Sequence, residues 1–408
     1  MIQRIEYLKT LALWQDKNVI KVITGIRRCG KSTLLEQFQE QLRKNGVEDA
    51  QILSLNFEKL DYEDLLDHKA LYQYVMSRLQ EGKTTYVFLD EIQMVPDFQK
   101  AVDSLYIQNN VDLYITGSNA WLLSGELATL LSGRYVEINL LPFSFAEYCR
   151  ARAVSGDAAL AEYLRWGGFP YVASLDKVSE QADVYLEGIY NTIIVKDIDL
   201  RQRRREYDPN KRKVTDITLL KNISRFLAGS VGSPVSDKSI ADYITSSGRK
   251  VSQSTISDYV EALVEPYIFY PVQRFDVSGK QLLKQNRKLY IADLGLRHHL
   301  LARREYDLGY SLENIVYFEL LRRGYRVNIG KLGQREIDFV AEKNTRTVYV
   351  QVTASMTDAA VFEREMAPLR AIRDNYPKIV LTLDRFTVGN YEGIEVINAV
   401  DWLLEKND

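Results

Sequence analysis

The sequence predicts an α/β fold in which a parallel sheet is covered by helices on both faces. Short runs of buried-type residues alternate with stretches of helical periodicity, and this alternation is typical of strands joined by crossover helices. A glycine-rich loop follows the first of these runs and leads directly into a helical stretch. The expected strands are residues 19–24, 52–57, 86–90, 113–116 and 135–140.

The bulk composition is that of an ordinary globular chain with room for more than one core. It has 408 residues, of which 46% are hydrophobic and 26% are charged. A formal net charge of -2 excludes a uniformly basic nucleic-acid coat, so any DNA binding is expected to be local. Two cysteines and three histidines provide neither a zinc-ligand set nor a disulfide framework. Charges within residues 1–18 and the lack of a long apolar run predict a cytoplasmic protein with no membrane partner.

The glycine-rich loop has the sequence GIRRCGKST. A strand before it and a helix after it are the context that a phosphate-binding P-loop requires. Gly25 and Gly30 let backbone N–H groups wrap the phosphates of a nucleotide at the helix N-terminus. Lys31 is expected to reach the β- and γ-phosphates, and Ser32 is expected to complete the shell of a Mg²⁺ ion. Together with Thr33, these residues form the expected binding site for ATP and Mg²⁺.

Two carboxylates stand at the end of the third expected strand. Asp90 is expected to hold the magnesium shell and Glu91 to polarise an attacking water, which together predict ATP hydrolysis. The next strand ends near Asn119, a polar residue that can orient this water, with Ser118 as the alternative. Arg134, at the start of the fifth strand, is either an arginine finger acting in a neighbouring subunit or a solvated strand-end residue.

Four segments resemble the bacterial and archaeal ATPases of the AAA+ superfamily that carry a C-terminal domain of unknown function. The segments are GIRRCGKST, YVFLDEIQ, ITGSNA and LPFSFAEY, and the similarity covers nearly the whole chain. The resemblance implies that Gly25, Gly30, Lys31 and Ser32 occupy Walker A positions. It also implies that Asp90 and Glu91 form Walker B, that Asn119 is the first sensor, and that the protein forms a homo-oligomer.

Three expected domains precede the C-terminal one. An ATPase core at residues 1–141 is followed by a helical lid or connector at 142–213. Residues 214–305 are expected to form a winged-helix domain, because two capped helices across a glycine turn are followed by two strands with a basic loop between them. The alternative is a winged helix that contacts only a protein partner. The residues expected to contact DNA are Lys250, Ser254, Lys280, Lys284 and Arg287.

Residues 306–408 resemble the restriction-endonuclease-like α/β fold. That fold cuts phosphodiesters with a metal-binding Asp on one strand and a Glu-x-Lys or Gln-x-Lys triplet on the next. Here the Asp is Asp338, and Glu313 on the preceding helix is a further candidate ligand. The triplet is Gln351-Val-Thr353, in which a hydroxyl replaces the lysine. We therefore expect this module to be catalytically degenerate.

Together these features predict a DNA-associated AAA+ ATPase that remodels DNA or moves along it as an oligomer. Two alternatives stay open. ATP binding could instead control the assembly of a switch that binds a protein partner through the C-terminal segments. The chain could also be an ATP-dependent nuclease, in which case Asp338→Ala would abolish Mg²⁺-dependent DNA cleavage.

Overall fold

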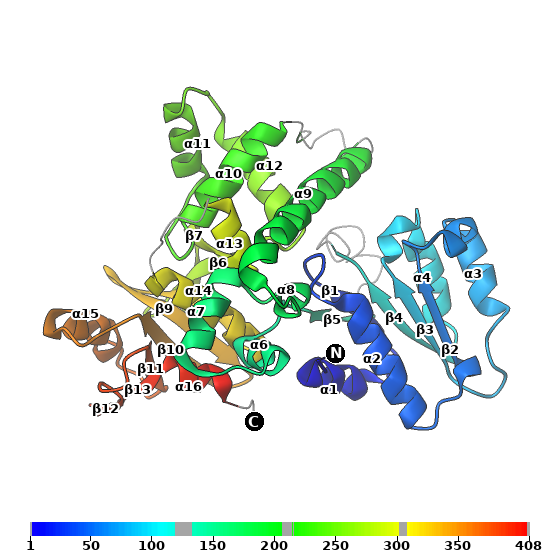
Figure 1. Ribbon diagram of the computed structural model, residues 1–408, viewed down its shortest axis with the longest axis horizontal. Coiled ribbons are helices and arrows are strands. Elements are labelled where there is room, and N and C mark those ends of the chain that lie inside the picture. The colour runs from blue at the N-terminus through cyan, green and yellow to red at the C-terminus, as the bar shows by residue number, and fades with distance from the viewer. Residues whose placement is uncertain (1, 119–132, 206–213, 215, 302–307, 406–408) are drawn as a thin grey trace. The chain divides into compact units, whose positions relative to one another are not determined.

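The structure of the protein is a computed structural model that describes residues 2–118, 133–205, 214, 216–301 and 308–405, with the backbone alone at 194–205 and 284–286. The chain divides into two compact units, and Figure 1 labels many of their elements. The main break, at Pro142, lies beside the boundary that the sequence suggests at residue 141. Unit 1 comprises Met1–Pro142 and Glu265–Tyr267, and unit 2 comprises Phe143–Val264 and Ile268–Asp408.

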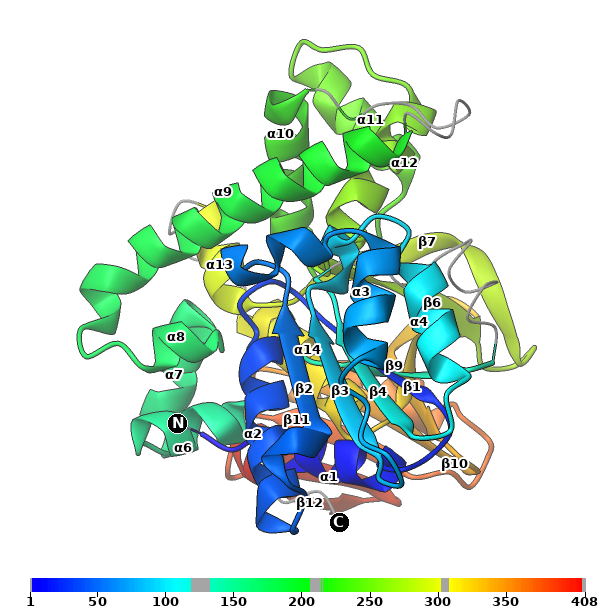
Figure 2. The ribbon, with the colours of Figure 1, turned by 90° about the vertical axis from the view of Figure 1, so that its right-hand side faces the viewer.

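Unit 1 is built on a five-stranded parallel sheet, seen in Figure 2. Its strands are β1 (Ile20–Thr24), β2 (Ile52–Asn56), β3 (Thr85–Asp90), β4 (Val111–Thr116) and β5 (Tyr135–Asn139), in the order β2-β3-β4-β1-β5. Its α-helices are α1 (Ile5–Trp14), α2 (Lys31–Lys44), α3 (His68–Met76) and α4 (Phe98–Tyr106), with short 3-10 turns η1 (Asp49–Gln51), η2 (Leu60–Leu65) and η3 (Ile92–Met94). All the strand pairings are parallel, which confirms the expected α/β sheet.

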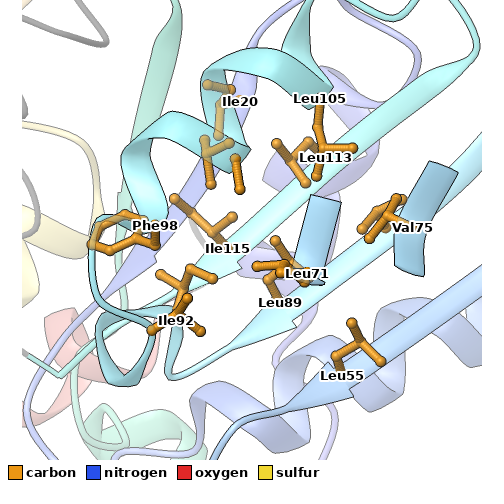
Figure 3. Close-up of a cluster of buried hydrophobic side chains, with 14 of the residues drawn as sticks. Ile20, Leu55, Leu71, Val75, Leu89, Ile92, Phe98, Leu105, Leu113 and Ile115 are labelled. Atoms are coloured by element: carbon orange, nitrogen blue, oxygen red, sulfur yellow. The ribbon is translucent and has the colours of Figure 1, made fainter. Parts of the chain in front are cut away.

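Helices cover both faces of this sheet because successive strand residues point to opposite sides. On one face, Phe38 of α2 packs against Phe88 and Tyr114. On the other face, α3 and α4 pack against alternate strand residues, among them Leu89 and Leu113 (Figure 3). The three central strands β1, β3 and β4 are therefore buried on both sides, as their continuous apolar runs require.

Unit 2 contains an eight-stranded mixed sheet with the order β12-β13-β11-β10-β9-β8-β6-β7. Its strands are β6 (Phe269–Asp276), β7 (Gln281–Ile291), β8 (Arg326–Leu332), β9 (Arg335–Lys343), β10 (Arg346–Thr353), β11 (Lys378–Thr382), β12 (Gly389–Tyr391) and β13 (Ile394–Asn398). Its helices are α6 (Phe145–Arg152), α7 (Gly156–Trp166), α8 (Pro170–Ala173), α9 (Val178–Arg205), α10 (Ile217–Gly229), α11 (Asp237–Ser246), α12 (Gln253–Val264), α13 (Leu294–Leu300), α14 (Leu308–Arg322), α15 (Ala359–Arg370) and α16 (Ala399–Leu404).

The sheet of unit 2 runs across the boundary that the sequence suggests at residue 305. Strand β6 pairs with β7 in an antiparallel hairpin, and its far end pairs in parallel with β8, where Arg274 lies opposite Ile329. The hairpin thus continues the C-terminal sheet instead of standing in a separate domain. Pairing with β8 covers an edge of the hairpin that would otherwise present unpaired backbone groups.

Two local predictions need correction. Strand β7 begins at Gln281, so Lys284 and Arg287 lie on a strand and not in a loop. The turn before it is tight because the Asp276 carboxylate accepts hydrogen bonds from the N–H groups of Ser278 and Gly279. Residues 201–213 are charged and include Pro209, a pattern that predicts a loop, but helix α9 continues to Arg205.

A buried carboxylate joins two turns of unit 2. Asp293 caps helix α13 by accepting hydrogen bonds from the N–H groups of Gly295 and Leu296. Its second oxygen accepts a hydrogen bond from Gly168, at 2.6 Å, in the turn after α7. A side chain at Gly167 would place its Cβ 2.0 Å from the Asp293 carboxylate, so the two glycines of this turn serve packing.

Candidate active site

The candidate active site lies at the carboxyl edge of the parallel sheet in unit 1. Strand β4 lies between β1 and β3, and the carboxyl ends of these parallel strands meet at one edge. β1 leads into the glycine-rich loop, β3 ends at Asp90, and β4 ends at Thr116. The sheet order therefore brings the Walker A and Walker B residues together.

Backbone geometry explains both glycines of the loop. Gly25 has a φ of 141°, and a Cβ there would lie 2.1 Å from the carbonyl oxygen of Leu140. Gly30 has a φ of 101° and precedes the first residue of α2, Lys31. The loop therefore leads directly into a helix N-terminus, where backbone N–H groups favour a phosphate. Ser32 and Thr33, also expected in the site, lie in the first turn of the same helix.

Lys31 folds back over the loop. Its Nζ donates a hydrogen bond to the carbonyl oxygen of Gly25 at 3.0 Å and lies 3.9 Å from Glu91 Oε1. The residue is 5% exposed, so its charge acts in a largely desolvated site. The ammonium is placed to exchange the Gly25 carbonyl for phosphate oxygens.

Asp90 is buried and held from three directions. Asn56 Nδ2 donates to its Oδ2 at 2.7 Å, the Thr116 hydroxyl donates to its Oδ1, and Ser32 also hydrogen-bonds to it. Burial raises the pKa of the Asp90 carboxyl, and the bonds from Ser32 and Thr116 oppose this rise. The contact with Ser32 unites the two residues expected to share a Mg²⁺ ion.

Glu91 has an unusual backbone, and each oxygen of its carboxylate accepts a hydrogen bond. Its φ of 54° is in the left-handed region, and its N–H donates to the Thr116 hydroxyl at 2.9 Å. Ser118 donates to Glu91 Oε1 at 2.6 Å, and Gln93 donates to Oε2. Burial by itself would raise the pKa of Glu91, but Lys31 and Ser118, with smaller contributions, lower it below its ordinary value. Glu91 is therefore held as a carboxylate beside the P-loop lysine.

Sequence reasoning missed three residues of this site. Thr116 bridges Asp90 and Glu91, and Asn56 fixes Asp90 from the end of β2. Arg27, which sequence reasoning leaves without a role, contributes positive charge that lowers the pKa of Glu91. The signal for Thr116 and Asn56 was the recurrence of a polar residue at the carboxyl end of each strand.

The remaining predicted catalytic residues are not part of this cluster. Asn119 lies outside the described residues, and its alternative, Ser118, contacts Glu91. Arg134 lies at the amino edge of the sheet, where its carbonyl accepts a hydrogen bond from Ile20 and its guanidinium pairs with Asp103. It is remote from the P-loop of its own chain, so its finger role remains a prediction for a neighbouring subunit.

The predicted DNA-contacting residues are spread over α12, the turn before it and the β6–β7 hairpin. Lys250, Ser254 and Lys280 are exposed. Arg287 donates to Asp237 Oδ1 at 2.9 Å and is 37% exposed in its side chain. The side chain of Lys284 lies outside the described part of the chain.

Comparison with known proteins places the chain in a family. Residues 17–149 match the family model of an AAA domain. An uncharacterized protein of Haemophilus influenzae is 41% identical over 99% of both chains. The chain belongs to the same family as this protein. The AAA match includes every Walker residue described above, so residues 17–149 form a P-loop domain of the AAA type.

Other matches extend over the rest of the chain. Residues 157–307 match the model of a domain of unknown function, which groups α7 to α13 together. Uncharacterized protein MJ1544 of Methanocaldococcus jannaschii is 27% identical over 94% of this chain and 85% of its own. The Walker-type ATPase PABY2304 of Pyrococcus abyssi has a TM-score of 0.47 at 15% identity, over 74% of this chain and 96% of its own. Among the helices that the structure describes, none has the length and apolar character needed to cross a bilayer.

Proposed function

We propose that the protein hydrolyses ATP in unit 1 with Glu91 as the general base. The observation that carries this proposal is the buried Glu91 carboxylate, fixed by Ser118 and Gln93 at 3.9 Å from the P-loop lysine. Its lowered pKa keeps it deprotonated at neutral pH, so it can accept a proton from an attacking water. Mg²⁺ bound with ATP would be held by Ser32 and Asp90 and would neutralise charge on the phosphates.

The test is steady-state ATP hydrolysis by the full chain, with Glu91→Gln as the matched variant. The amide keeps the size and hydrogen-bonding capacity of the side chain but cannot accept the proton as a carboxylate does. We expect nucleotide binding to persist while turnover falls, since a general base contributes about 10²- to 10⁴-fold. Turnover at the wild-type rate in this variant would assign the base to another residue.

We further propose that the ATPase acts on DNA through α11, α12 and the β6–β7 hairpin of unit 2. Ser236 caps α11, and Ser252 caps α12 by accepting a hydrogen bond from the N–H of Thr255 at 3.1 Å. Ile256 and Tyr259 form the buried side of α12, while its N-terminal turn is exposed. An exposed helix N-terminus near Lys250 favours contact with phosphates, which supports the winged-helix interpretation.

DNA binding is tested by measuring affinity for single-stranded, duplex and branched DNA across a salt series. Replacing Lys250 and Lys280 together with Ala should weaken binding, and the logarithmic salt dependence should become shallower by about one for each phosphate that is no longer neutralised. Lys177→Ala is the control, because Lys177 is also exposed but pairs with Glu180 on α9. Binding that is weak and independent of salt in all these proteins would favour the protein-partner switch.

An oligomeric assembly is part of the same proposal. Arg134 is 44% exposed in its side chain and lies at the edge of the sheet opposite its own P-loop, so it can act only in the site of another subunit. Sizing the protein with and without a slowly hydrolysed ATP analogue tests this assembly. A monomer under both conditions would remove the basis for an arginine finger.

A further inference from the structure

Unit 2 contains a cleft of about 850 Å³ whose lining is rich in charged groups. We call it the unit 2 cleft and define it by Lys288 on β7, Glu313 on α14, Glu336 and Asp338 on β9, and Gln351 on β10. It contains the Asp and Gln expected from the restriction-endonuclease-like resemblance. It also contains a lysine that the sequence does not suggest, because Lys288 belongs to the segment expected as a winged helix.

The direction of strand β7 carries Lys288 into this cleft. Residues 288 and 290 share one face of the strand, and the Tyr290 hydroxyl donates to Glu313 Oε1 at 2.6 Å. The side-chain amide of Asn314 then fixes the strand, since it accepts from the N–H of Ile291 and donates to the carbonyl of the same residue. Lys288 and Tyr290 are thereby directed at helix α14, whereas Arg287 points the other way, to α11.

Lys288 lies among three carboxylates. Its Nζ is 2.9 Å from Glu313 Oε1, 2.8 Å from Glu336 Oε1 and 3.9 Å from Asp338 Oδ1. The side chain is 3% exposed, so water does not screen these contacts. Burial alone would lower the pKa of Lys288, but the three carboxylates raise it above its ordinary value, and the ammonium stays charged.

The groups that would hold a divalent cation are engaged with protein donors instead. Asp338 Oδ2 accepts from the N–H of Val352 at 2.8 Å, which leaves its other oxygen facing Lys288. The amide oxygen of Gln351 accepts from the N–H of Asp338, and its amide nitrogen donates to Glu365. Throughout the described ranges of the chain, no three His, Cys, Asp or Glu side chains are arranged to hold a metal ion. The residues of the cleft therefore do not fit the metal that the resemblance implies.

We propose that the ammonium of Lys288 takes the place of a divalent cation in the unit 2 cleft, which makes the cleft a metal-free site that does not cleave phosphodiesters. A single ammonium offsets negative charge of the carboxylates, as a divalent metal ion would, but it offers no open coordination position to a water molecule. The absence of a lysine at Thr353 agrees with this, because a site without a metal has no bound water to activate. The proposal is independent of whether DNA is the partner of the ATPase.

The competing view is that Lys288 is a displaced catalytic lysine of a metal-dependent nuclease. Such a lysine must face the reacting phosphate and water, whereas the Lys288 ammonium is shared among the carboxylates that would ligate the metal. The two views make opposite predictions for the same substitutions, since one requires Lys288 for metal-dependent chemistry and the other requires it to exclude the metal.

The experiment measures Mn²⁺ binding to nucleotide-free full-length protein by electron paramagnetic resonance or calorimetry, in a Lys31→Ala background that suppresses carried-over nucleotide. Without the ammonium, the carboxylates that now face Lys288 Nζ can rearrange around a hard cation and should bind it about tenfold or more tightly than the parent protein does. Lys288→Ala should therefore gain a Mn²⁺ site, and adding Asp338→Asn should remove it. Lys343→Ala is the matched control, because Lys343 contacts a backbone carbonyl outside the cleft.

Mn²⁺ should also raise the melting temperature of Lys288→Ala and leave that of the parent protein unchanged. A folded Lys288→Ala protein that gains no Mn²⁺ site would overturn the proposal. If Lys288→Ala does not fold, Mn²⁺ binding is measured on the parent protein instead. Binding that Asp338→Asn removes would overturn the proposal, and the absence of binding would support it. Mg²⁺-dependent DNA cleavage that is abolished in Asp338→Asn would overturn it as well.

Discussion

Thr116→Val tests the most specific feature of the nucleotide site. The Thr116 side chain is fully buried, accepts a hydrogen bond from the N–H of Glu91 and donates one to Asp90. Valine has nearly the same volume, so the substitution removes the hydroxyl without opening a cavity. Both partners then lack a hydrogen bond in a site that excludes water.

The magnitude follows from these two bonds. Leaving a buried donor or acceptor unsatisfied costs about 1–3 kcal/mol, so the two together should lower the free energy of unfolding of unit 1 by about 2–6 kcal/mol. The left-handed backbone conformation of Glu91 costs about 1–2 kcal/mol. In Thr116→Val it also loses the hydrogen bond from the Glu91 N–H to the Thr116 hydroxyl, which holds it in that conformation. A base displaced by about 1 Å can lose about 10²-fold in rate, so we expect turnover to fall by about 10- to 100-fold.

The assay compares steady-state ATP turnover and nucleotide affinity in wild type, Thr116→Val and Thr116→Ser. Serine keeps the hydroxyl and should retain most of the turnover, while nucleotide affinity should change little in either variant because Lys31 and its loop are untouched. Wild-type turnover in Thr116→Val would refute the argument that this hydroxyl positions Glu91. Equal losses in both variants would show that packing, and not hydrogen bonding, matters at this position.

Three further predictions concern single sites. Gly25→Ala should abolish nucleotide binding because its Cβ would meet the Leu140 carbonyl oxygen, and an unchanged affinity measured with a fluorescent nucleotide would contradict this. Because the pKa of Glu91 is lowered, its carboxylate should stay deprotonated from pH 8 down to about pH 5, and the turnover rate should not fall for lack of a base in this range. A turnover rate that depends on Glu91 and declines below pH 7 would argue against the assignment. Burial raises the pKa of Asp293 from 3.8 to about 6, against the backbone N–H groups that lower it. The stability that this carboxyl contributes is therefore complete below pH 3.8 and is lost as the pH rises through about 6, a change of about 3 kcal/mol at about 1.4 kcal/mol per unit. Urea unfolding at pH 4 and pH 7 should show a smaller change in Asp293→Asn than in wild type, and equal changes would contradict the prediction.

The positions expected for the Walker residues could be named from the sequence because each motif is local. Gly25 to Gly30 form one loop after a strand, Lys31 and Ser32 begin the helix that follows it, and Asp90 and Glu91 are adjacent at a strand end. Thr116 and Asn56 could not be assigned in this way, because their contacts with Asp90 depend on the order β2-β3-β4 in the sheet.

The C-terminal half shows a second reason for such misses. Asp338 and Gln351 lie on the neighbouring strands β9 and β10 as expected, and Glu313 lies on the preceding helix α14. Lys288 was missed because its strand was assigned to another domain. Alternation along β7 predicts that neighbouring residues face opposite sides, but it does not predict that one of those sides is the wall of a cleft.

The shared sheet of unit 2 also limits how this protein can be divided. A break at residue 305 would separate β6 from β8 and leave each with an unpaired edge, and exposed edges of this kind promote aggregation. It would also separate Lys288 from Glu313 and leave buried carboxylates without their counter-ion. The hairpin segment and the C-terminal segment are therefore expected to fold together, and a fragment that ends or begins between them is expected to be insoluble.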